Sequence, residues 1–159
     1  MQRSDEPFLR QAIEISWRSR RNGNHPFGAL LVDAAGKVIL EGENTVMVAR
    51  DCTGHAELNL MRDASQRFSR GLLAGCTLYT STEPCAMCSG AIYWGNVGRV
   101  VYALSEAHLK DYIGDDPENP TLALPCREVF ARGQRLIEVL GPALEEEAGA
   151  AHKGFWHPG

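Results

Sequence analysis

The stretch CTLYTSTEPCAMCSGAIYWGNVGRVVYAL, residues 76–104, decides the fold class of this chain. Residues 76–81 are rich in β-forming side chains, residues 85–94 are typical of a helix, and residues 97–104 form a second β-rich run. Strands and helices that alternate in this way form a sheet covered by helices, with functional residues where strand ends meet helix N-termini. The sequence therefore predicts an α/β fold.

The segments on either side extend this alternation over the rest of the chain. Apolar spacing, capping residues and turn residues define the further elements. They are a helix from about residue 8, a hairpin over residues 28–42, a helix over 55–66, a loop over 114–120, a strand over 136–140 and a helix over 142–153. With 159 residues and no repeat or linker, the chain is expected to form a single domain over residues 1–159.

The composition is that of an ordinary folded protein. Hydrophobic residues make up 44% and charged residues 23%, which argues against a disordered chain or a coiled coil. The N-terminal residues lack the apolar core of a signal peptide, and no apolar run approaches the roughly 20 residues of a membrane span. We therefore expect a cytoplasmic protein without a membrane partner. Its formal net charge of −4 provides no general attraction to nucleic acid.

Two cysteines of the central stretch, Cys85 and Cys88, stand three positions apart directly behind a proline. In a cytoplasmic chain with five cysteines, such a pair indicates metal or redox chemistry more than a disulfide framework. Upstream, His55 begins a predicted helix and Glu57 follows it. One imidazole and two thiolates give zinc three ligands and leave a fourth position for water, as in catalytic sites. Glu57 is then the candidate for moving protons beside the metal.

Other interpretations of the cysteines remain open from the sequence. A C-x-x-C pair alone also occurs in thioredoxin-like redox sites and in structural zinc sites. A closed structural zinc site would need a fourth ligand, for which Cys52 is the candidate. Otherwise Cys52, Cys76 and Cys126 are expected to be simple buried thiols. The remaining histidines have no partner motif and are expected to lie on the surface or to pack: His25, His108, His152 and His157.

His-Ala-Glu at residues 55–57 and Pro-Cys-x-x-Cys at residues 84–88 together resemble the zinc-dependent cytidine deaminase-like superfamily. The likeness includes HPFGALLV at residues 25–32 and covers roughly residues 8–104. It implies a three-layer α/β/α sandwich around a central mixed sheet of about five strands. It also implies one Zn²⁺ per chain and the following site residues: the metal ligands His55, Cys85 and Cys88, and the catalytic proton shuttle Glu57.

The segment EPCAMCSGAIYW, residues 83–94, is most similar to bacterial guanine deaminases and also resembles fungal cytosine deaminases and tRNA adenosine deaminases. The resemblance therefore implies hydrolytic deamination of a free nucleobase or related aminoheterocycle, with release of ammonia. Guanine, converted to xanthine, is the preferred substrate, and cytosine or a tRNA adenosine are the alternatives. The acidic net charge argues against tRNA. A structural zinc-binding module is the alternative without enzymatic activity.

The same resemblance places five residues at the substrate: Asn44, Ala56, Glu83, Trp94 and Asp115. Asn44 would bind the base, and the backbone carbonyl of Glu83 would accept a hydrogen bond from the leaving amino group. Trp94 would border the pocket, and Asp115 would contact a purine. Without the resemblance, Asn44 is typical of a turn, Trp94 of a core position and Asp115 of a solvated loop.

Aromatic side chains are expected to close the site, because a free base has apolar faces and few polar anchors. Phe27, Phe155 and Trp156 are the candidates, and one of the two terminal aromatics is expected to cover the pocket and exclude water. In the resembling bacterial guanine deaminases, the C-terminal segment lies over an active site through a swapped dimer. We therefore expect a homodimer, with or without such swapping.

Overall fold

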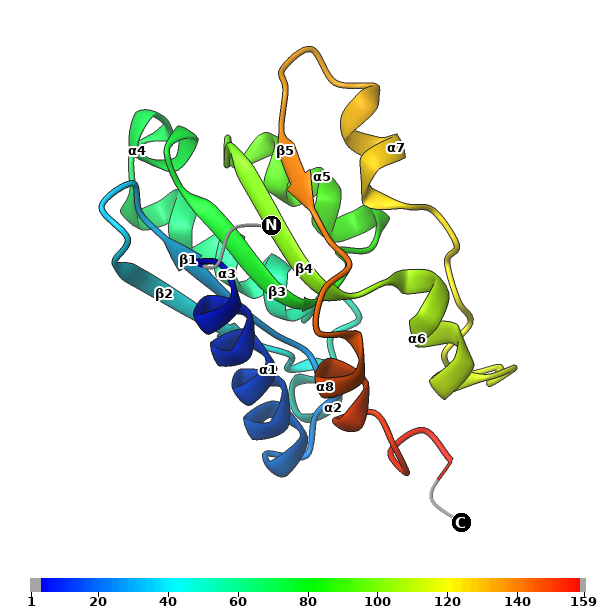
Figure 1. Ribbon diagram of the computed structural model, residues 1–159. Helices are drawn as coiled ribbons and strands as arrows, with labels where there is room; N and C mark the ends of the chain where they lie inside the picture. The colour runs from blue at the N-terminus through cyan, green and yellow to red at the C-terminus, as the bar shows by residue number, and fades with distance from the viewer. Residues whose placement is uncertain (1–3, 158–159) are drawn as a thin grey trace.

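The computed structural model describes residues 4–157 and contains one five-stranded sheet. Its strands are β1 (Gly28–Val32), β2 (Val38–Glu43), β3 (Thr77–Thr82), β4 (Arg99–Leu104) and β5 (Glu138–Leu140). Their order across the sheet is β2-β1-β3-β4-β5 (Figure 1). β1 pairs antiparallel with β2 and β3, whereas β4 is parallel to both β3 and β5. The predicted mixed sheet of five strands is confirmed, as is the hairpin of β1 and β2.

Helices cover both faces of the sheet and complete the three layers. They are α1 (Glu6–Arg21), α2 (Val46–Ala49), α3 (Ala56–Arg67), α4 (Arg70–Ala74), α5 (Ala86–Trp94), α6 (Glu106–Ile113), α7 (Cys126–Ala131) and α8 (Glu145–Ala150). α1 and α8 lie on one face, in front in Figure 1, and α3 and α5 lie on the opposite face. The helices expected in the first 94 residues are present, and α8 is shorter than the predicted final helix.

Neighbouring residues of the central strands point to opposite faces and so contribute to two separate cores. Leu31, Leu78 and Val100 belong to the core beneath α3 and α5. Leu30 and Tyr79 belong to the core beneath α1. This division follows from the two-residue period of a strand. Because helices cover both of its faces, β1 is buried along its whole length, which explains its continuous apolar sequence.

A glycine in β2 sets the position at which α3 begins. A Cβ atom at Gly42 would lie 2.5 Å from the carbonyl oxygen of Ala56 and 2.9 Å from Cβ of Leu60. These distances are shorter than real Cβ contacts, so any larger residue at position 42 would push α3 away from the sheet. Gly42 thus fixes the place of the first turn of α3, which carries the His-Ala-Glu motif.

The carboxylate of Glu83 ties together the segments that follow β3 and β4. It accepts hydrogen bonds from the backbone N–H of Glu106 at 2.9 Å and from that of Cys126 at 3.0 Å. These are the first residues of α6 and α7. The sequence predicts neither helix, because both are short and depend on this contact with a residue far away in the chain.

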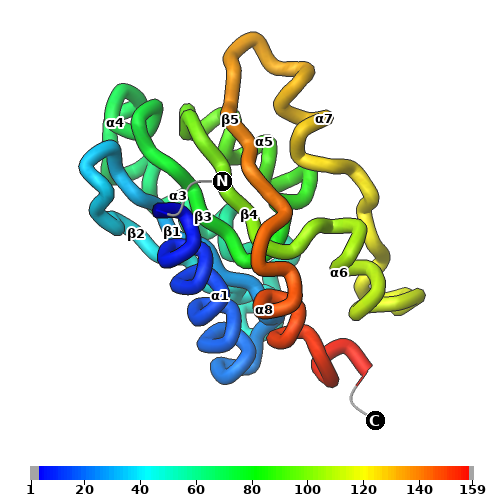
Figure 2. The backbone as a smooth tube through the Cα atoms, viewed as in Figure 1, coloured from blue at the N-terminus to red at the C-terminus, as the bar shows by residue number. Residues whose placement is uncertain are grey.

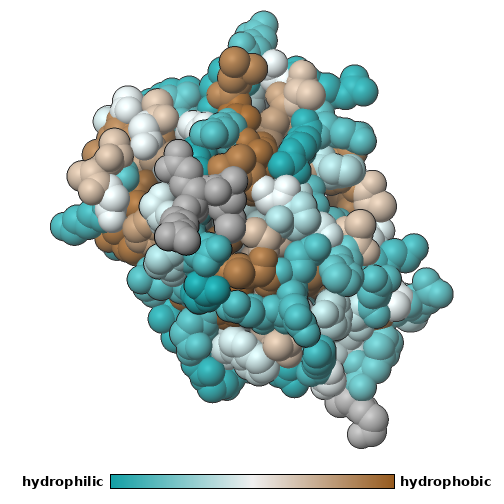
Figure 3. Space-filling view, viewed as in Figure 1, coloured by the Kyte–Doolittle hydropathy of each residue, from teal (hydrophilic) through white to brown (hydrophobic). Residues whose placement is uncertain are grey.

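The surface of the protein is mostly hydrophilic on the face that carries α1 and α8 (Figure 3). A hydrophobic strip lies over β5 on this face, and Leu136, two residues before β5, is 98% exposed. Among the helices of residues 4–157, none combines the length and apolar character that crossing a bilayer requires.

Candidate active site

The three predicted zinc ligands come together where two helices begin. His55 is the N-cap of α3, Cys85 is the N-cap of α5, and Cys88 lies in the first turn of α5. Nδ1 of His55 lies 3.5 Å from Sγ of Cys85 and 3.6 Å from Sγ of Cys88. Tetrahedral zinc with bonds of about 2.0 Å to nitrogen and about 2.3 Å to sulfur separates such atoms by about 3.5 Å. The donor set and its spacing therefore fit one zinc ion.

The two thiols of this group have opposite pKa shifts. The pKa of Cys85 is lowered to about 4, chiefly by its hydrogen bond with Cys88, and the neighbouring His55 also favours the thiolate. The pKa of Cys88 is raised by the same hydrogen bond and by burial. The two sulfurs thus share one proton. Binding of a metal ion by both sulfurs releases that proton. The metal affinity of the site therefore increases with pH as long as Cys88 carries the proton.

Cys52 does not belong to the ligand group. Within residues 4–157, the His, Cys, Asp and Glu side chains close enough to share a metal are His55, Cys85 and Cys88. Cys52 is exposed in the loop before α3, so the prediction that it is a buried thiol is wrong. The closed structural site with Cys52 as fourth ligand is likewise not supported. Cys76 and Cys126 are buried, as predicted.

Glu57 lies two residues beyond His55 and is outside the ligand group. It is buried, with only 5% of its surface exposed. The hydroxyl of Thr80, on β3, lies 2.5 Å from its carboxylate and 2.9 Å from the carbonyl oxygen of Thr82. Burial raises the pKa of Glu57. A carboxyl group with a raised pKa beside a metal site is suited to accept and return a proton near neutral pH. Thr80 is a contact that the sequence interpretation missed.

A cavity of about 420 Å³ opens beside the ligands and is lined by His55, Glu57 and Cys85. Its volume falls within the range of about 300–1,000 Å³ that is typical of ligand pockets. Most of the remaining lining surface is apolar, and the large apolar side chains that contribute to it are Phe27, Val46, Met87, Leu109, Ile113, Leu122 and Trp156. The cavity therefore offers a flat, weakly polar ligand a mainly apolar surface together with polar groups, among them those of the metal ligands and Glu57.

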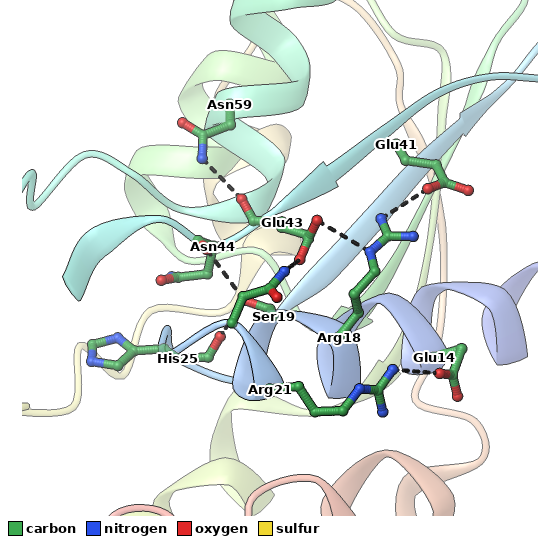
Figure 4. A network of polar contacts seen from close by, with 10 residues as sticks. Glu14, Arg18, Ser19, Arg21, His25, Glu41, Glu43, Asn44 and Asn59 are labelled. Atoms are coloured by element: carbon green, nitrogen blue, oxygen red, sulfur yellow. Dashed lines mark hydrogen bonds and ion pairs between the residues drawn. The ribbon is translucent and has the colours of Figure 1, made fainter. Parts of the chain in front are cut away.

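Asn44 and Ala56 lie next to the cavity but are not among the described residues that line it. Asn44 is 1% exposed, and its side-chain oxygen accepts a hydrogen bond from the N–H of Val46, which does line the cavity. The buried hydroxyl of Ser19 lies 3.2 Å from the carbonyl oxygen of Asn44 and 2.8 Å from that of His25 (Figure 4). Ser19 therefore joins the end of α1 to two loops beside the cavity.

Two further predicted residues, Phe27 and Glu83, do line the cavity. Phe27 stands directly before β1 and faces the rings of His152 and Trp156, with centroid distances of 5.2 Å and 6.1 Å. The carboxylate of Glu83 is occupied by the starts of α6 and α7. Any contact of Glu83 with a substrate is therefore left to its backbone.

The structure does not bring Trp94 or Asp115 to this cavity. Trp94 is 76% exposed and lies against a shallow groove formed with Met61 of α3. α5 begins at the metal ligands and runs away from them, and nine residues of helix span about 14 Å. Asp115 is exposed in the loop after α6, directly before Asp116, whose carboxylate accepts hydrogen bonds within that loop.

Several lining residues have no signal in the sequence that predicts them. His25, expected to lie on the surface or to pack, lines the cavity and contacts the ring of Trp156. Glu106, the first residue of α6, also lines it, and burial raises its pKa to about 7. The loop residues 118–122 form another part of the wall. Only the fold brings these segments to the metal ligands.

Comparisons with known proteins agree with the site. The family profile described as the cytidine and deoxycytidylate deaminase zinc-binding region matches residues 2–104. A probable cytosine deaminase of Schizosaccharomyces pombe is 42% identical over 155 residues, which is 98% of this chain and 94% of that protein. The guanine deaminase of Bacillus subtilis is 39% identical over 112 residues, or 70% of this chain and 71% of that protein.

Solved structures show the same relationship. A guanine deaminase from Nitrosomonas europaea superposes with a TM-score of 0.73 at 27% identity, covering 91% of this chain and 80% of that one. A tRNA:A34 deaminase superposes with a TM-score of 0.64 at 26% identity, covering 86% and 97%. With a matching profile over residues 2–104 and a His-Cys-Cys group of zinc geometry, the chain belongs to the cytidine and deoxycytidylate deaminase family of zinc-binding enzymes, which act on C–N bonds.

Proposed function

We propose that the protein catalyses the hydrolytic deamination of a free nucleobase or a closely related aminoheterocycle. The observation that carries this proposal is the position of Glu57, buried beside three zinc ligands and in the wall of an apolar cavity. Zinc bound by His55, Cys85 and Cys88 supplies the Lewis acidity that activates water. Water adds to the ring carbon that carries the amino group, the C–N bond breaks, and ammonia and a carbonyl result.

The residues of the chain divide this work between proton transfer and orientation. Glu57 accepts one proton from the water and passes it to the ring nitrogen, and then takes the second proton from the newly added hydroxyl and passes it to the departing amine. The backbone carbonyl of Glu83 orients the amino group, and the rings of Phe27 and Trp156 enclose the faces of the base. Asn44 helps to shape the loop, and Ala56 the start of α3, that border the cavity. A structural zinc module would need neither a buried proton acceptor nor this enclosure.

Two observations lead us to place cytosine, or another single-ring aminopyrimidine, first among the substrates. The similarity to the probable cytosine deaminase extends over nearly the whole of both chains. Trp94 and Asp115, through which the sequence resemblance implies guanine, lie away from the cavity. Guanine is the second candidate, favoured by the segment at residues 83–94 and by the structural similarity to guanine deaminases. A tRNA substrate is disfavoured by the net charge of −4.

Ammonia release from a panel of substrates tests this proposal. The panel contains cytosine, guanine, adenine, a pterin and an aminotriazine, together with cytidine and an RNA hairpin that carries a wobble adenosine. We expect turnover of free bases, with cytosine or guanine giving the highest kcat/KM. Deamination of the RNA hairpin with no turnover of any free base would contradict the proposal. Release from cytidine as fast as from cytosine would contradict the restriction to free bases.

Deletion of residues 155–159 is expected to raise KM or to lower kcat for the best substrate of the panel. The deletion removes Trp156 from the cavity wall, so closure contributes less to binding and to the exclusion of water. Zinc content and the thermal unfolding transition should stay close to those of the full chain, because the metal ligands are untouched. Steady-state kinetics with elemental analysis measure both effects. Unchanged kinetics would show that the terminal aromatics only pack.

A homodimer and a cytoplasmic location remain expectations from the sequence. We propose that the C-terminal segment closes the site of its own chain, because Trp156 lines that cavity. Sedimentation analysis of the full chain and of the 155–159 deletion would show whether association depends on that segment.

A further inference from the structure

The last described residues, 151–157, form a segment that we call the C-terminal strap. It follows α8 and lies at the same end of the molecule as the end of α1 (Figures 1 and 2), with which it shares hydrogen bonds. Trp156 belongs to the strap and lines the cavity with His55 and Glu57. The position of this indole therefore depends on whatever holds the strap against the rest of the fold.

One arginine of α1 binds the strap at its beginning. Nη1 of Arg20 donates hydrogen bonds of 2.8 Å to the carbonyl oxygen of Ala151 and of 2.8 Å to that of Lys153. Ala151 is the C-cap of α8, where carbonyls lack partners within the helix, and Lys153 lies in the turn that follows. A single guanidinium thus joins two parts of the chain that are separated by more than a hundred residues.

The same guanidinium also contacts two aromatic rings, one on α1 and one in the strap. Its central carbon lies 5.6 Å from the ring centroid of Trp17, also on α1, and 5.5 Å from that of Phe155, in the strap. Arginine favours such positions because its planar cation stacks on aromatic faces while it donates hydrogen bonds in its plane. Arg20 therefore restrains the strap both at the backbone and at Phe155.

Contacts within the strap carry this restraint to the cavity. Phe155 packs edge-on against Trp156 with a centroid distance of 4.9 Å. The indole N–H of Trp156 donates to Nδ1 of His152 at 3.2 Å, and the two rings are nearly parallel, with an interplanar angle of 8°. His152 is only 2% exposed, and burial lowers its pKa to about 3, so the imidazole is neutral and can accept this hydrogen bond.

We propose that Arg20 is a positioning residue for the site: it fixes the strap and so holds Trp156 in the wall of the cavity. This inference rests on the proposed function in one respect, because only turnover shows that the wall matters for catalysis. Arg20 is not among the described residues that line the cavity, so its effect on a substrate is indirect, and its contacts with the strap provide the route to Trp156. Loss of the Arg20 side chain is expected to weaken closure of the cavity by Trp156 and to leave the zinc ligands unchanged.

Arg20→Ala tests the proposal, with Arg21→Ala as the matched control. Arg21 is the next residue of α1, but its ion pair is with the exposed Glu14 and not with the strap. We expect Arg20→Ala to shift KM or kcat by a factor similar to that of the 155–159 deletion, at unchanged zinc content, and Arg21→Ala to shift neither. In the chain that already lacks residues 155–159, Arg20→Ala should have no further kinetic effect, because no indole remains to be positioned. An additive effect there would overturn the proposal.

Hydrogen exchange provides a readout that does not depend on activity. Arg20→Ala should speed amide exchange in residues 151–157 and leave exchange in α3 and α5 unchanged. Unchanged exchange in the strap would overturn the proposal, whereas a chain without deaminase activity but with faster exchange would contradict only the proposed function. If Arg20→Ala fails to fold, Arg20→Lys serves as the second variant. Lysine keeps the charge but cannot bind two carbonyls and stack in the same way, so an intermediate increase in exchange is expected.

Discussion

Glu57→Gln is expected to lower kcat by about 10²-fold or more while the fold and the zinc content stay unchanged. The amide has nearly the same shape as the carboxyl group, and its oxygen can still accept the hydrogen bond from Thr80, which lies 2.5 Å away. It cannot take up the two protons of the water in turn and pass one to the ring nitrogen and the other to the amine. Steady-state kinetics on the best substrate of the panel, together with elemental analysis, measure the two properties separately.

The matched control for this substitution is Glu14→Gln. Glu14 lies on α1 with a side chain that is 69% exposed, so the same chemical change there should leave kcat unchanged. Two outcomes would contradict the role given to Glu57. Loss of zinc in Glu57→Gln would make the carboxylate a ligand, and full activity with zinc retained would mean that another group transfers the proton.

Cys88→Ala is expected to abolish both zinc binding and deamination. The substitution removes one of three protein ligands from a site whose remaining donors, His55 and Cys85, form an incomplete set. Cys76→Ala is the matched control, because Cys76 is similarly buried but lies outside the ligand group. Elemental analysis should find one zinc per chain in the parent and in Cys76→Ala, and none in Cys88→Ala. A zinc content in Cys88→Ala equal to that of the parent would exclude Cys88 as a ligand.

The ligand group could be predicted from the sequence because each part of it is local. His55 and Cys85 cap the first turns of their helices, and Cys88 follows within one turn of Cys85, so short motifs suffice to place them. The same applies to the sheet, because β1 is a continuous apolar run and β3 and β4 are rich in β-forming residues. The motifs alone do not show that the starts of α3 and α5 lie side by side. The alternation of strands and helices already indicated that they do.

The wall of the cavity could not be predicted in the same way, because it is assembled from distant segments. Short helices such as α6 and α7 have weak local signals and are held by the side chain of Glu83, which comes from another part of the chain. For Trp94 the difficulty is the reverse, because the sequence gives a signal but the structure places the residue away from the cavity. It stands in a recognised motif, but the length of α5 carries it away from the ligands to an exposed position.

The two hydrogen bonds accepted by Glu83 also bear on how ring specificity can diverge. Because one carboxylate holds the N–H groups of Glu106 and Cys126, the segment between them, residues 107–125, forms a closed loop with both ends fastened at one point. Residues 118–122 of that loop lie in the cavity wall. Insertions or exchanges within it would alter the shape of the wall without moving the zinc ligands. The carboxylate that precedes Pro-Cys-x-x-Cys thus makes this loop a separable part of the cavity wall in this chain, one that can change shape while the zinc ligands stay in place.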